Sequence, residues 1–195
     1  IIVDELTGST IAATTITVGD DGFGTIDIAY IDGNAVDIDN NHALNSVVLS
    51  DGGSFSYTAT AGNVTATLVN TGAGNLTINA ANGTMALVNL DTTTGAVDID
   101  ATGNITITDN GGVTSAGAAV INIDSSAGFI RNSAASDGTA DISTDGGTIT
   151  LVANTGIADS TGSAGLDIDS STGNVSLTND GTTAGTFVDY VSNAG

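Results

Sequence analysis

Aspartate recurs at two sequence positions that lie two residues apart. The first position holds Asp98, Asn122, Asp141, Asp167 and Asp189. The second position holds Asp100, Asp124, Ser143 and Asp169. Because residues i and i+2 of a β-strand lie on the same face, we expect the two rows to run side by side and to point outward.

Carboxylates in such rows repel each other by about 1 kcal/mol per neighbouring pair in water. Bound Ca²⁺ would offset this repulsion, since it takes six to eight oxygen ligands from carboxylates, amides, carbonyls and water. The candidate ligands are Asp98, Asp100, Asn122, Asp124, Asp141, Asp167, Asp169 and Asp189. The alternative is that the carboxylates are simply solvated and keep the protein soluble. No cofactor is required in that case.

Candidates for catalysis are few. A Ser-His-Asp triad would have to use His42, the single histidine, whose neighbours Asn41 and Asn45 indicate a polar corner instead. Residues 37–41 resemble the start of an EF-hand loop, but His42 replaces the required Gly and Val48 the final acid, so that match fails. Glycoside hydrolysis needs only two suitably separated carboxylates, whereas a lyase would have Arg131 as its sole basic group. We predict a protein that is not an enzyme, with a polysaccharide hydrolase as the alternative.

Two further motifs suggest surface chemistry. Sequons for N-glycosylation occur at Asn63, Asn75, Asn82, Asn104 and Asn174, although such matches also arise by chance in a chain rich in Asn and Thr. Thr-x-Thr pairs occur at Thr65/Thr67 and Thr106/Thr108, with Ser176/Thr178 as a variant. Regular Thr arrays on a flat face are typical of ice-binding proteins, a third functional hypothesis. The array is interrupted at residues 85–87 and 129–131, which favours the ordinary strand preference of Thr.

Composition excludes several partner classes. The 195 residues contain 22 acidic and one basic side chain, giving a formal net charge of -21. Such a chain cannot neutralise a row of phosphates, so we expect no nucleic acid and no anionic lipid surface as a partner. The apolar residues come singly or in short runs, and we therefore expect no direct insertion into a membrane.

A repeat organises the elements that carry these residues. The unit reads apolar-x-apolar, about four residues, Gly-x-apolar-x-apolar, and it begins at residues 16, 36, 55, 76, 97, 121, 140, 166 and 188. The mean spacing is about 21 residues. Each half alternates apolar and polar residues, as a strand with one buried face does, and Gly, Asn, Asp, Ser and Thr separate the halves.

This period predicts an all-β fold, a parallel β-solenoid of about nine coils with about 21 residues each. The absence of Pro agrees, because each strand N–H is needed for pairing. We expect residues 1–195 to form a single solenoid segment, with residues 1–15 as a less regular lead-in. The chain begins without Met and shows no obvious cap, which favours an excerpt of a longer repetitive protein.

Units such as residues 103–108 (GNITIT) and 173–178 (GNVSLT), preceded by residues 97–100 (VDID) or 166–169 (LDID), resemble the repeats of filamentous-haemagglutinin-type large bacterial surface adhesins. The resemblance extends over about residues 55–190. It implies a right-handed parallel β-helix that serves as a stalk at the cell surface, with adhesion often located elsewhere on the chain.

Together these observations predict an extracellular or cell-surface structural protein. The chain would form a segment of a stalk, filament or surface layer, with Ca²⁺ as a stabilising ligand. Its expected partners are further copies of itself, by end-to-end or lateral assembly, or other surface components.

Overall fold

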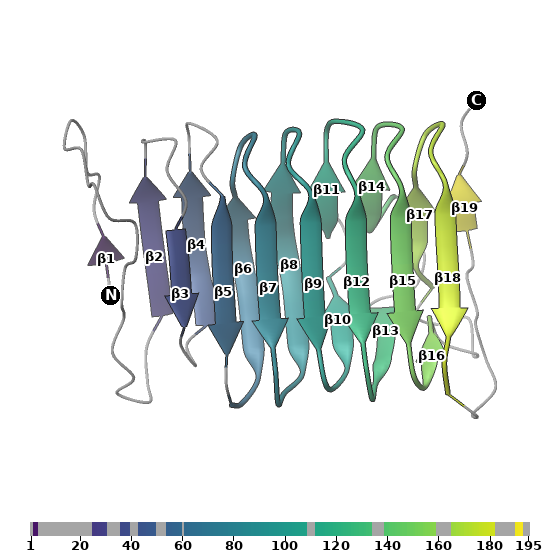
Figure 1. Cartoon of the computed structure of the whole chain (residues 1–195), viewed down its shortest axis with the longest axis horizontal. Coiled ribbons are helices and arrows are strands. Elements are labelled where there is room, and N and C mark those ends of the chain that lie inside the picture. Colours follow the sequence, from purple (N-terminus) through teal and green to yellow (C-terminus); the bar gives the residue numbers. More distant parts are fainter. Residues whose placement is uncertain are drawn as a thin grey trace.

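The protein is an all-β parallel solenoid in the computed structural model (Figure 1). The structure describes residues 2–3, 25–30, 36–39, 43–49, 54–59, 61–108, 112–133, 139–158, 165–181 and 190–192. Every strand pairing in these residues is parallel, and none of them is helical. The predicted fold class is therefore confirmed.

Two sheets form the walls of the solenoid. The first, sheet B, has seven strands in chain order: β3 (Val36–Asp39), β5 (Phe55–Ala59), β7 (Leu76–Ala80), β9 (Val97–Ala101), β12 (Ile121–Ser125), β15 (Ile149–Ala153) and β18 (Val175–Asn179). The second, sheet A, begins with β1 (Ile2–Val3), β2 (Thr25–Tyr30), β4 (Ala43–Leu49), β6 (Val64–Asn70) and β8 (Met85–Thr92). Successive strands of each sheet come from successive coils.

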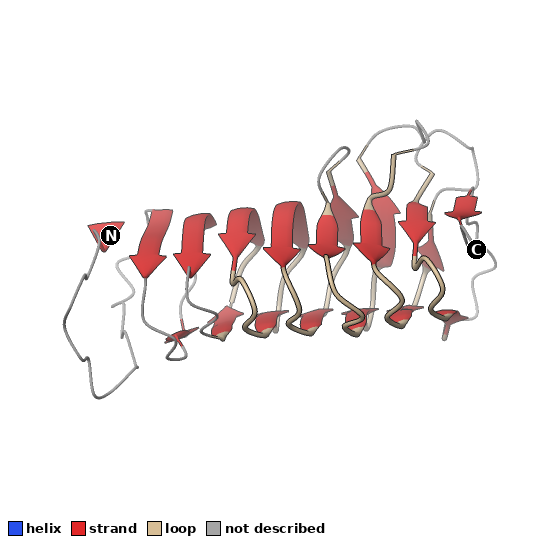
Figure 2. Ribbon diagram, turned by 90° about the horizontal axis from the view of Figure 1, so that it is seen from above, coloured by secondary structure: helices blue, strands red, loops and turns tan. Residues whose placement is uncertain are grey.

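Sheet A divides into two arms at β8. Residues 85–87 of β8 pair with β10 (Ile105–Ile107), and the first arm continues through β13 (Phe129–Asn132) and β16 (Gly156–Ile157). Residues 90–92 pair with β11 (Val113–Ser115), and the second arm continues through β14 (Ile142–Thr144), β17 (Asp167–Asp169) and β19 (Tyr190–Ser192). Each coil after β8 thus has three strands, and the added strands widen this half of the solenoid when it is seen from above (Figure 2).

The extra strand lengthens the coils. From Phe55 to Val175, sheet B makes five steps over 120 residues, a mean of 24 per coil. The predicted period of about 21 holds only before the division, and the described residues from Phe55 to Val175 make about five coils of 24 residues, whereas the prediction gave about nine coils of about 21 for the whole chain. The predicted starts at 36, 55, 76, 97 and 121 lie on sheet B, but those at 140 and 166 lead into β14 and β17 of sheet A. The starts at 16 and 188 fall outside the described residues.

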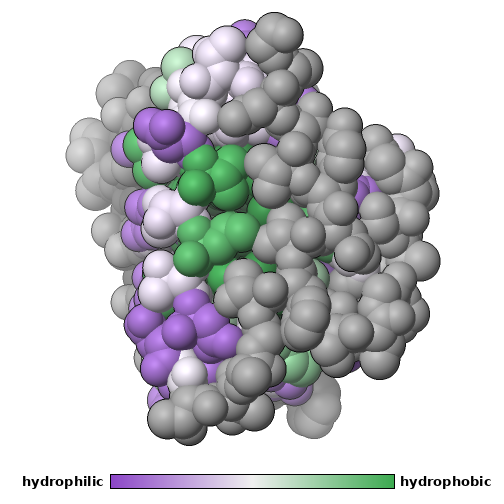
Figure 3. All heavy atoms as spheres, turned by 90° about the vertical axis from the view of Figure 1, so that its right-hand side faces the viewer, coloured by the Kyte–Doolittle hydropathy of each residue, from purple (hydrophilic) through white to green (hydrophobic). Residues whose placement is uncertain are grey.

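The C-terminal end of sheet B is only partly covered. Val175 and Leu177 of β18 are partly buried, whereas their counterparts Ile149 and Leu151 on β15 are fully buried. Figure 3, which views the molecule from this end, shows hydrophobic surface in its middle. Among the described residues, no strand pairs with β18 on the side away from β15.

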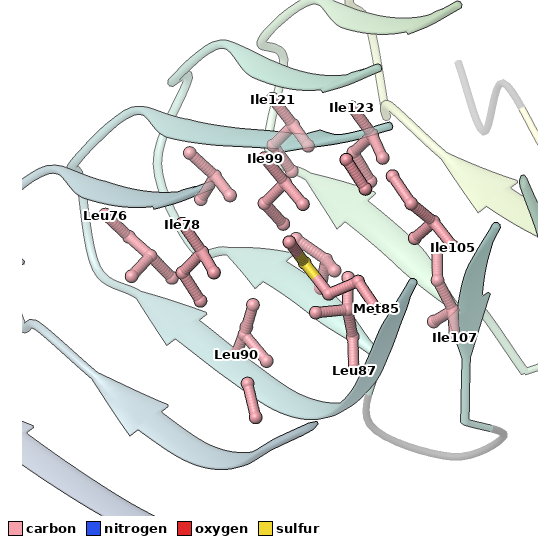
Figure 4. Packing of buried hydrophobic residues seen from close by; sticks show 14 of the residues in the cluster. Leu76, Ile78, Met85, Leu87, Leu90, Ile99, Ile105, Ile107, Ile121 and Ile123 are labelled. Atoms are coloured by element: carbon pink, nitrogen blue, oxygen red, sulfur yellow. The ribbon is translucent and has the colours of Figure 1, made fainter. Parts of the chain in front are cut away.

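Inward side chains stack in columns that fill the space between the sheets (Figure 4). Phe55, Leu76, Val97, Ile121 and Ile149 form one column of sheet B. Val64, Met85, Ile105, Ile130 and Ile157 form a column of sheet A. All of these are at most 2% exposed. Each such burial stabilises the fold by about 1.5–3 kcal/mol, so packing holds the chain together without disulfides.

Candidate functional site

The outward face of sheet B gathers the predicted carboxylates of β9 and β12. Asp98 is in register with Asn122, and Asp100 with Asp124, on adjacent strands. Asp98 is exposed, and Asp100 and Asp124 are half-buried. We call this surface the acidic face. The sequence predicted this pairing correctly, because the repeat is regular between residues 97 and 124.

The pKa values of two of these carboxyls are raised. Burial raises the pKa of Asp100, and the charges of Asp98 and Asp124 raise it further. Burial also raises the pKa of Asp124, with an added contribution from Asp180. The neighbouring carboxylates thus oppose the ionisation of Asp100 and Asp124, and no basic side chain lies among them to offset this effect.

A pocket lies at the edge of the acidic face, between the corners of adjacent coils. It is lined by Asp124, Ser125, Ser126, Val152, Ala153, Asn154 and Asp180. Its two carboxylates, one amide and two hydroxyls are oxygen donors of the kind that Ca²⁺ takes. Among the described residues, no three His, Cys, Asp or Glu side chains are grouped for metal binding, so amide, carbonyl or water oxygens would have to complete a site here. Asp180 is not among the predicted ligands; its position one residue after β18 was the available signal.

Asp141 and Asp167 depart from the predicted outward row. They lie on the second arm of sheet A and are 0% and 1% exposed. The Asn132 amide donates hydrogen bonds of 2.9 Å to both Asp141 carboxylate oxygens, and the Asp167 backbone N–H donates a third of 2.9 Å. The expectation that both residues share the row of Asp98 and point outward is therefore wrong. Asp141 instead ties β13 to β17, across the interval between the two arms.

The remaining members of the rows are separated from the acidic face. Asp169 is on sheet A beside Ser143, and its carboxylate accepts the Ser171 N–H at 2.8 Å. It lines a second pocket with Ser115, Ala116, Ser143, Thr144, Asp145 and Ser171. Asp189 and His42 lie outside the described residues. The structure thus brings together Asp98, Asp100, Asn122 and Asp124 of the predicted cation ligands, and places Asp141, Asp167 and Asp169 elsewhere.

The sequon asparagines occupy corners, but not a single one. Asn63 and Asn104 precede strands of sheet A, whereas Asn75 and Asn174 precede strands of sheet B. The side-chain oxygens of Asn63, Asn75 and Asn104 accept backbone N–H groups of the next coil, from Thr84, Ala96 and Phe129 at 3.0, 3.0 and 3.2 Å. Asn63, Asn75, Asn82 and Asn174 are exposed and Asn104 is half-buried. Their glycosylation stays a prediction.

The threonine pairs do not form one array. The column that begins at Thr65 continues on successive coils with Ala86, Thr106 and Arg131. Threonine therefore does not occupy adjacent coils in this column. Ser176 and Thr178 lie on β18 of sheet B, so this pair is on a different sheet from Thr65/Thr67 and does not extend its array. The interruption that the sequence indicated at residues 86 and 131 is confirmed.

Comparison with known proteins adds no family. The chain matches no protein-family model, no curated protein and no solved structure. In the described part of the chain, no helix is long and apolar enough to cross a membrane. The resemblance to surface adhesins therefore rests on the repeat units and the parallel β-solenoid alone.

Proposed function

We propose that this chain is a structural, non-enzymatic segment of an extracellular or cell-surface protein, acting as a stalk, filament or layer element. The observation that supports the proposal is the continuous stacking of coils. Buried aliphatic columns fill the interior, and each coil hydrogen-bonds to the next in both sheets. Such a body keeps two ends at a fixed separation, which is what a spacer requires.

Its outward surface fits the same role. Small polar side chains and carboxylates cover the acidic face, and the repeat resembles that of adhesin stalks. An adhesive site would be carried by other parts of the assembly. The competing polysaccharide hydrolase would use two carboxylates of the acidic face, as Asp100 and Asp124 are the pair with raised pKa values.

Two measurements test the proposal. Antibody labelling of intact, unpermeabilised source cells should detect the chain at the surface, and a signal that appears only after permeabilisation would contradict the location. Incubation with a panel of polysaccharides should release no reducing ends. Release that is lost on Asp124→Asn would favour the hydrolase instead.

We also propose that Ca²⁺ stabilises the acidic face through Asp124 and Asp180. Adding Ca²⁺ to chelator-treated protein should raise the midpoint of thermal unfolding, because an ion that binds only the folded state stabilises it. Asp124→Asn with Asp180→Asn should remove that increase, while the exposed Asp145→Asn should retain it. Equal midpoints with Ca²⁺ and with chelator would leave the carboxylates as a solvated surface.

A further inference from the structure

Charge is unevenly distributed over the described surface. The outward side chains of β6, the start of β8, β10 and β13 carry no carboxylate. We call this surface, which is neutral apart from one arginine, the neutral strip. It consists of Thr65, Thr67, Ala86, Thr106, Phe129 and Arg131. Carboxylates lie instead on the acidic face of sheet B and on the second arm of sheet A, where Asp91, Asp145 and Asp169 are found.

The only basic side chain of the protein lies in the neutral strip. The Arg131 guanidinium lies over the Phe129 ring, 4.1 Å from its centroid, and forms no ion pair with any described residue. A guanidinium on an aromatic ring still has donors for a carboxylate, and it pairs with one in a bidentate manner more favourably than an ammonium does. In a chain with 22 acidic residues, an Arg that pairs with no described carboxylate is therefore a candidate for a contact outside its own fold.

We infer that the neutral strip of one copy packs laterally on the acidic face of a second copy. Arg131 would pair with the carboxylates of Asp98, Asp100 or Asp124, which have no basic neighbour in their own chain. Apart from Arg131 and the Phe129 ring beneath it, the strip consists of Thr and Ala, whose short side chains let the two β-surfaces approach closely. This inference rests on the proposed structural role and names the partner surface within it.

The repeat of the two surfaces matches. Both consist of strands from successive coils, which are spaced by about 4.8 Å along the same axis. Rods that lie side by side therefore keep the strands of the two surfaces in step, and they place the hydroxyls of Thr65 and Thr106, two coils apart, opposite polar residues of the acidic face. The chain already shows such a hydroxyl-to-carboxylate contact between coils, from Thr114 Oγ1 to Asp91 Oδ1 at 2.9 Å.

The contact is heterologous, because two different faces meet. Each copy keeps one face of each kind free, so addition continues sideways and yields a layer or bundle rather than a closed dimer. Two copies of net charge -21 also repel each other at long range. This repulsion is screened at high salt, since the Debye length falls from about 30 Å at 0.01 M to about 8 Å at 0.15 M.

Sedimentation velocity of the full chain tests the inference. We expect monomers at about 0.01 M NaCl and concentration-dependent association at about 0.15 M and above. Arg131→Gln should weaken the association about tenfold or more, as expected for a charge pair desolvated in an interface. Unchanged association of Arg131→Gln, or monomers at every salt and protein concentration, would overturn the inference.

A charge-matched pair of variants separates the acidic face from net charge. Asp98→Asn with Asp100→Asn removes two charges from the acidic face, and Asp145→Asn with Asp169→Asn removes two from sheet A. The first should weaken association and the second should strengthen it by lowering repulsion. Equal effects of the two variants would contradict the assigned face. Thermal unfolding of each variant confirms that it remains folded.

Cross-linking locates the contact, because the natural chain has no cysteine. Thr106→Cys in one copy and Asn122→Cys in another should form a mixed disulfide under mild oxidation. Thr106→Cys mixed with Thr114→Cys should not, because Thr114 is on the second arm of sheet A. The reverse result would overturn the inference. Either failure leaves the stalk proposal intact if surface labelling succeeds, so the two proposals can be rejected separately.

Discussion

Single hydroxyl groups close the corners that follow sheet A. Thr71, Thr92 and Ser170 are buried, and each donates a hydrogen bond to the carbonyl three residues ahead, at 2.7, 2.8 and 3.1 Å. Thr144 donates instead to the Gly117 and Ala119 carbonyls of the previous coil, at 2.8 and 3.0 Å. Ser115 occupies the same column, but its buried hydroxyl has no partner. The column therefore offers a comparison of paired and unpaired hydroxyls in one environment.

Thr92→Val should lower the free energy of unfolding by about 1–3 kcal/mol, because the Gly95 carbonyl loses its donor in a buried corner. Ser115→Ala should be neutral or slightly stabilising, since it removes a polar atom that is buried without a partner. Chemical denaturation of both variants measures the difference. A greater loss for Ser115→Ala would contradict this account.

Asp141 is the buried carboxylate on which the two arms converge. Asp141→Ala leaves the Asn132 amide and the Asp167 N–H without this acceptor, and should cost roughly 3 kcal/mol of unfolding free energy. The exposed Asp145→Ala should change it by less than about 0.5 kcal/mol. A similar small effect for both substitutions, measured by urea unfolding, would show that the buried network contributes little.

The raised pKa values of Asp100 and Asp124 predict a pH dependence. A carboxyl whose pKa is raised by folding binds protons more readily in the folded state, so its contribution to stability falls as pH rises from 3.8 through the folded pKa. Asp100→Asn and Asp124→Asn should therefore stabilise the protein at pH 7, by less than about 1 kcal/mol each because solvent screens these groups. The gain should vanish below pH 3.8. Thermal unfolding against pH measures it, and an equal gain at every pH would contradict the electrostatic cause.

At the scale of elements, the division of sheet A decides what the sequence could predict. Up to β12, apolar alternation and the following Gly placed strands on the correct sheet, because each coil holds one unit. After the division, the interval from β14 to β15 also reads as apolar-x-apolar followed by Gly-x-apolar-x-apolar. Alternation identifies a buried face but does not say which sheet carries it, so Asp141 and Asp167 were assigned to the wrong row.

A finer signal for the second arm was present. The end of β8 that pairs with this arm carries a hydroxyl residue at its last position, in Leu90-Asp91-Thr92. The strands of the arm show the same pattern, as in Ile142-Ser143-Thr144. Most sheet B strands have Ala at that point, as in Ile78-Asn79-Ala80. Most strands of sheet B carry a small apolar residue there, whereas the corner after sheet A uses a hydroxyl that donates a hydrogen bond to a backbone carbonyl. The pocket at Asp124 and Asp180 could not be predicted, because it depends on how two corners of different length stack.

Glycine sets the spacing of coils at one corner. A Cβ on Gly83 would overlap the Gly62 carbonyl oxygen, a backbone atom of the coil below. Gly62 itself has open space around it but a φ of +84°, which L-residues adopt at a cost. The two residues thus have different reasons to be glycine.

Gly83→Ala should force the coils apart and lower the free energy of unfolding by about 1–3 kcal/mol or more, as overpacking does. Gly62→Ala should cost only about 1–2 kcal/mol, and Gly62→Asn less, because Asn tolerates positive φ. Urea unfolding of the three variants gives the order. A smaller loss for Gly83→Ala than for Gly62→Asn would contradict the close approach.

At the scale of the whole molecule, the buried aliphatic columns stabilise the fold, whereas most of the described carboxylates that give the net charge lie on the surface. Sequence alone established the acidic composition and the class of fold, since both depend on counts and period. It did not show that the neutral strip and the acidic face lie on different sheets, because that separation arises only when strands far apart in sequence stack. The proposed assembly would therefore depend on the folded surface and not on the composition.

The position of β1 and β19 at opposite ends of the stack has a mechanical consequence (Figure 1). Strands lie across the long axis, so tension applied between the ends loads the hydrogen bonds of one coil at a time, in a peeling direction. Each coil of about 24 residues would release roughly 80 Å of extended chain. A stack of this kind holds its length until a coil detaches, and it would then lengthen in steps, one coil after another, rather than break at a single point.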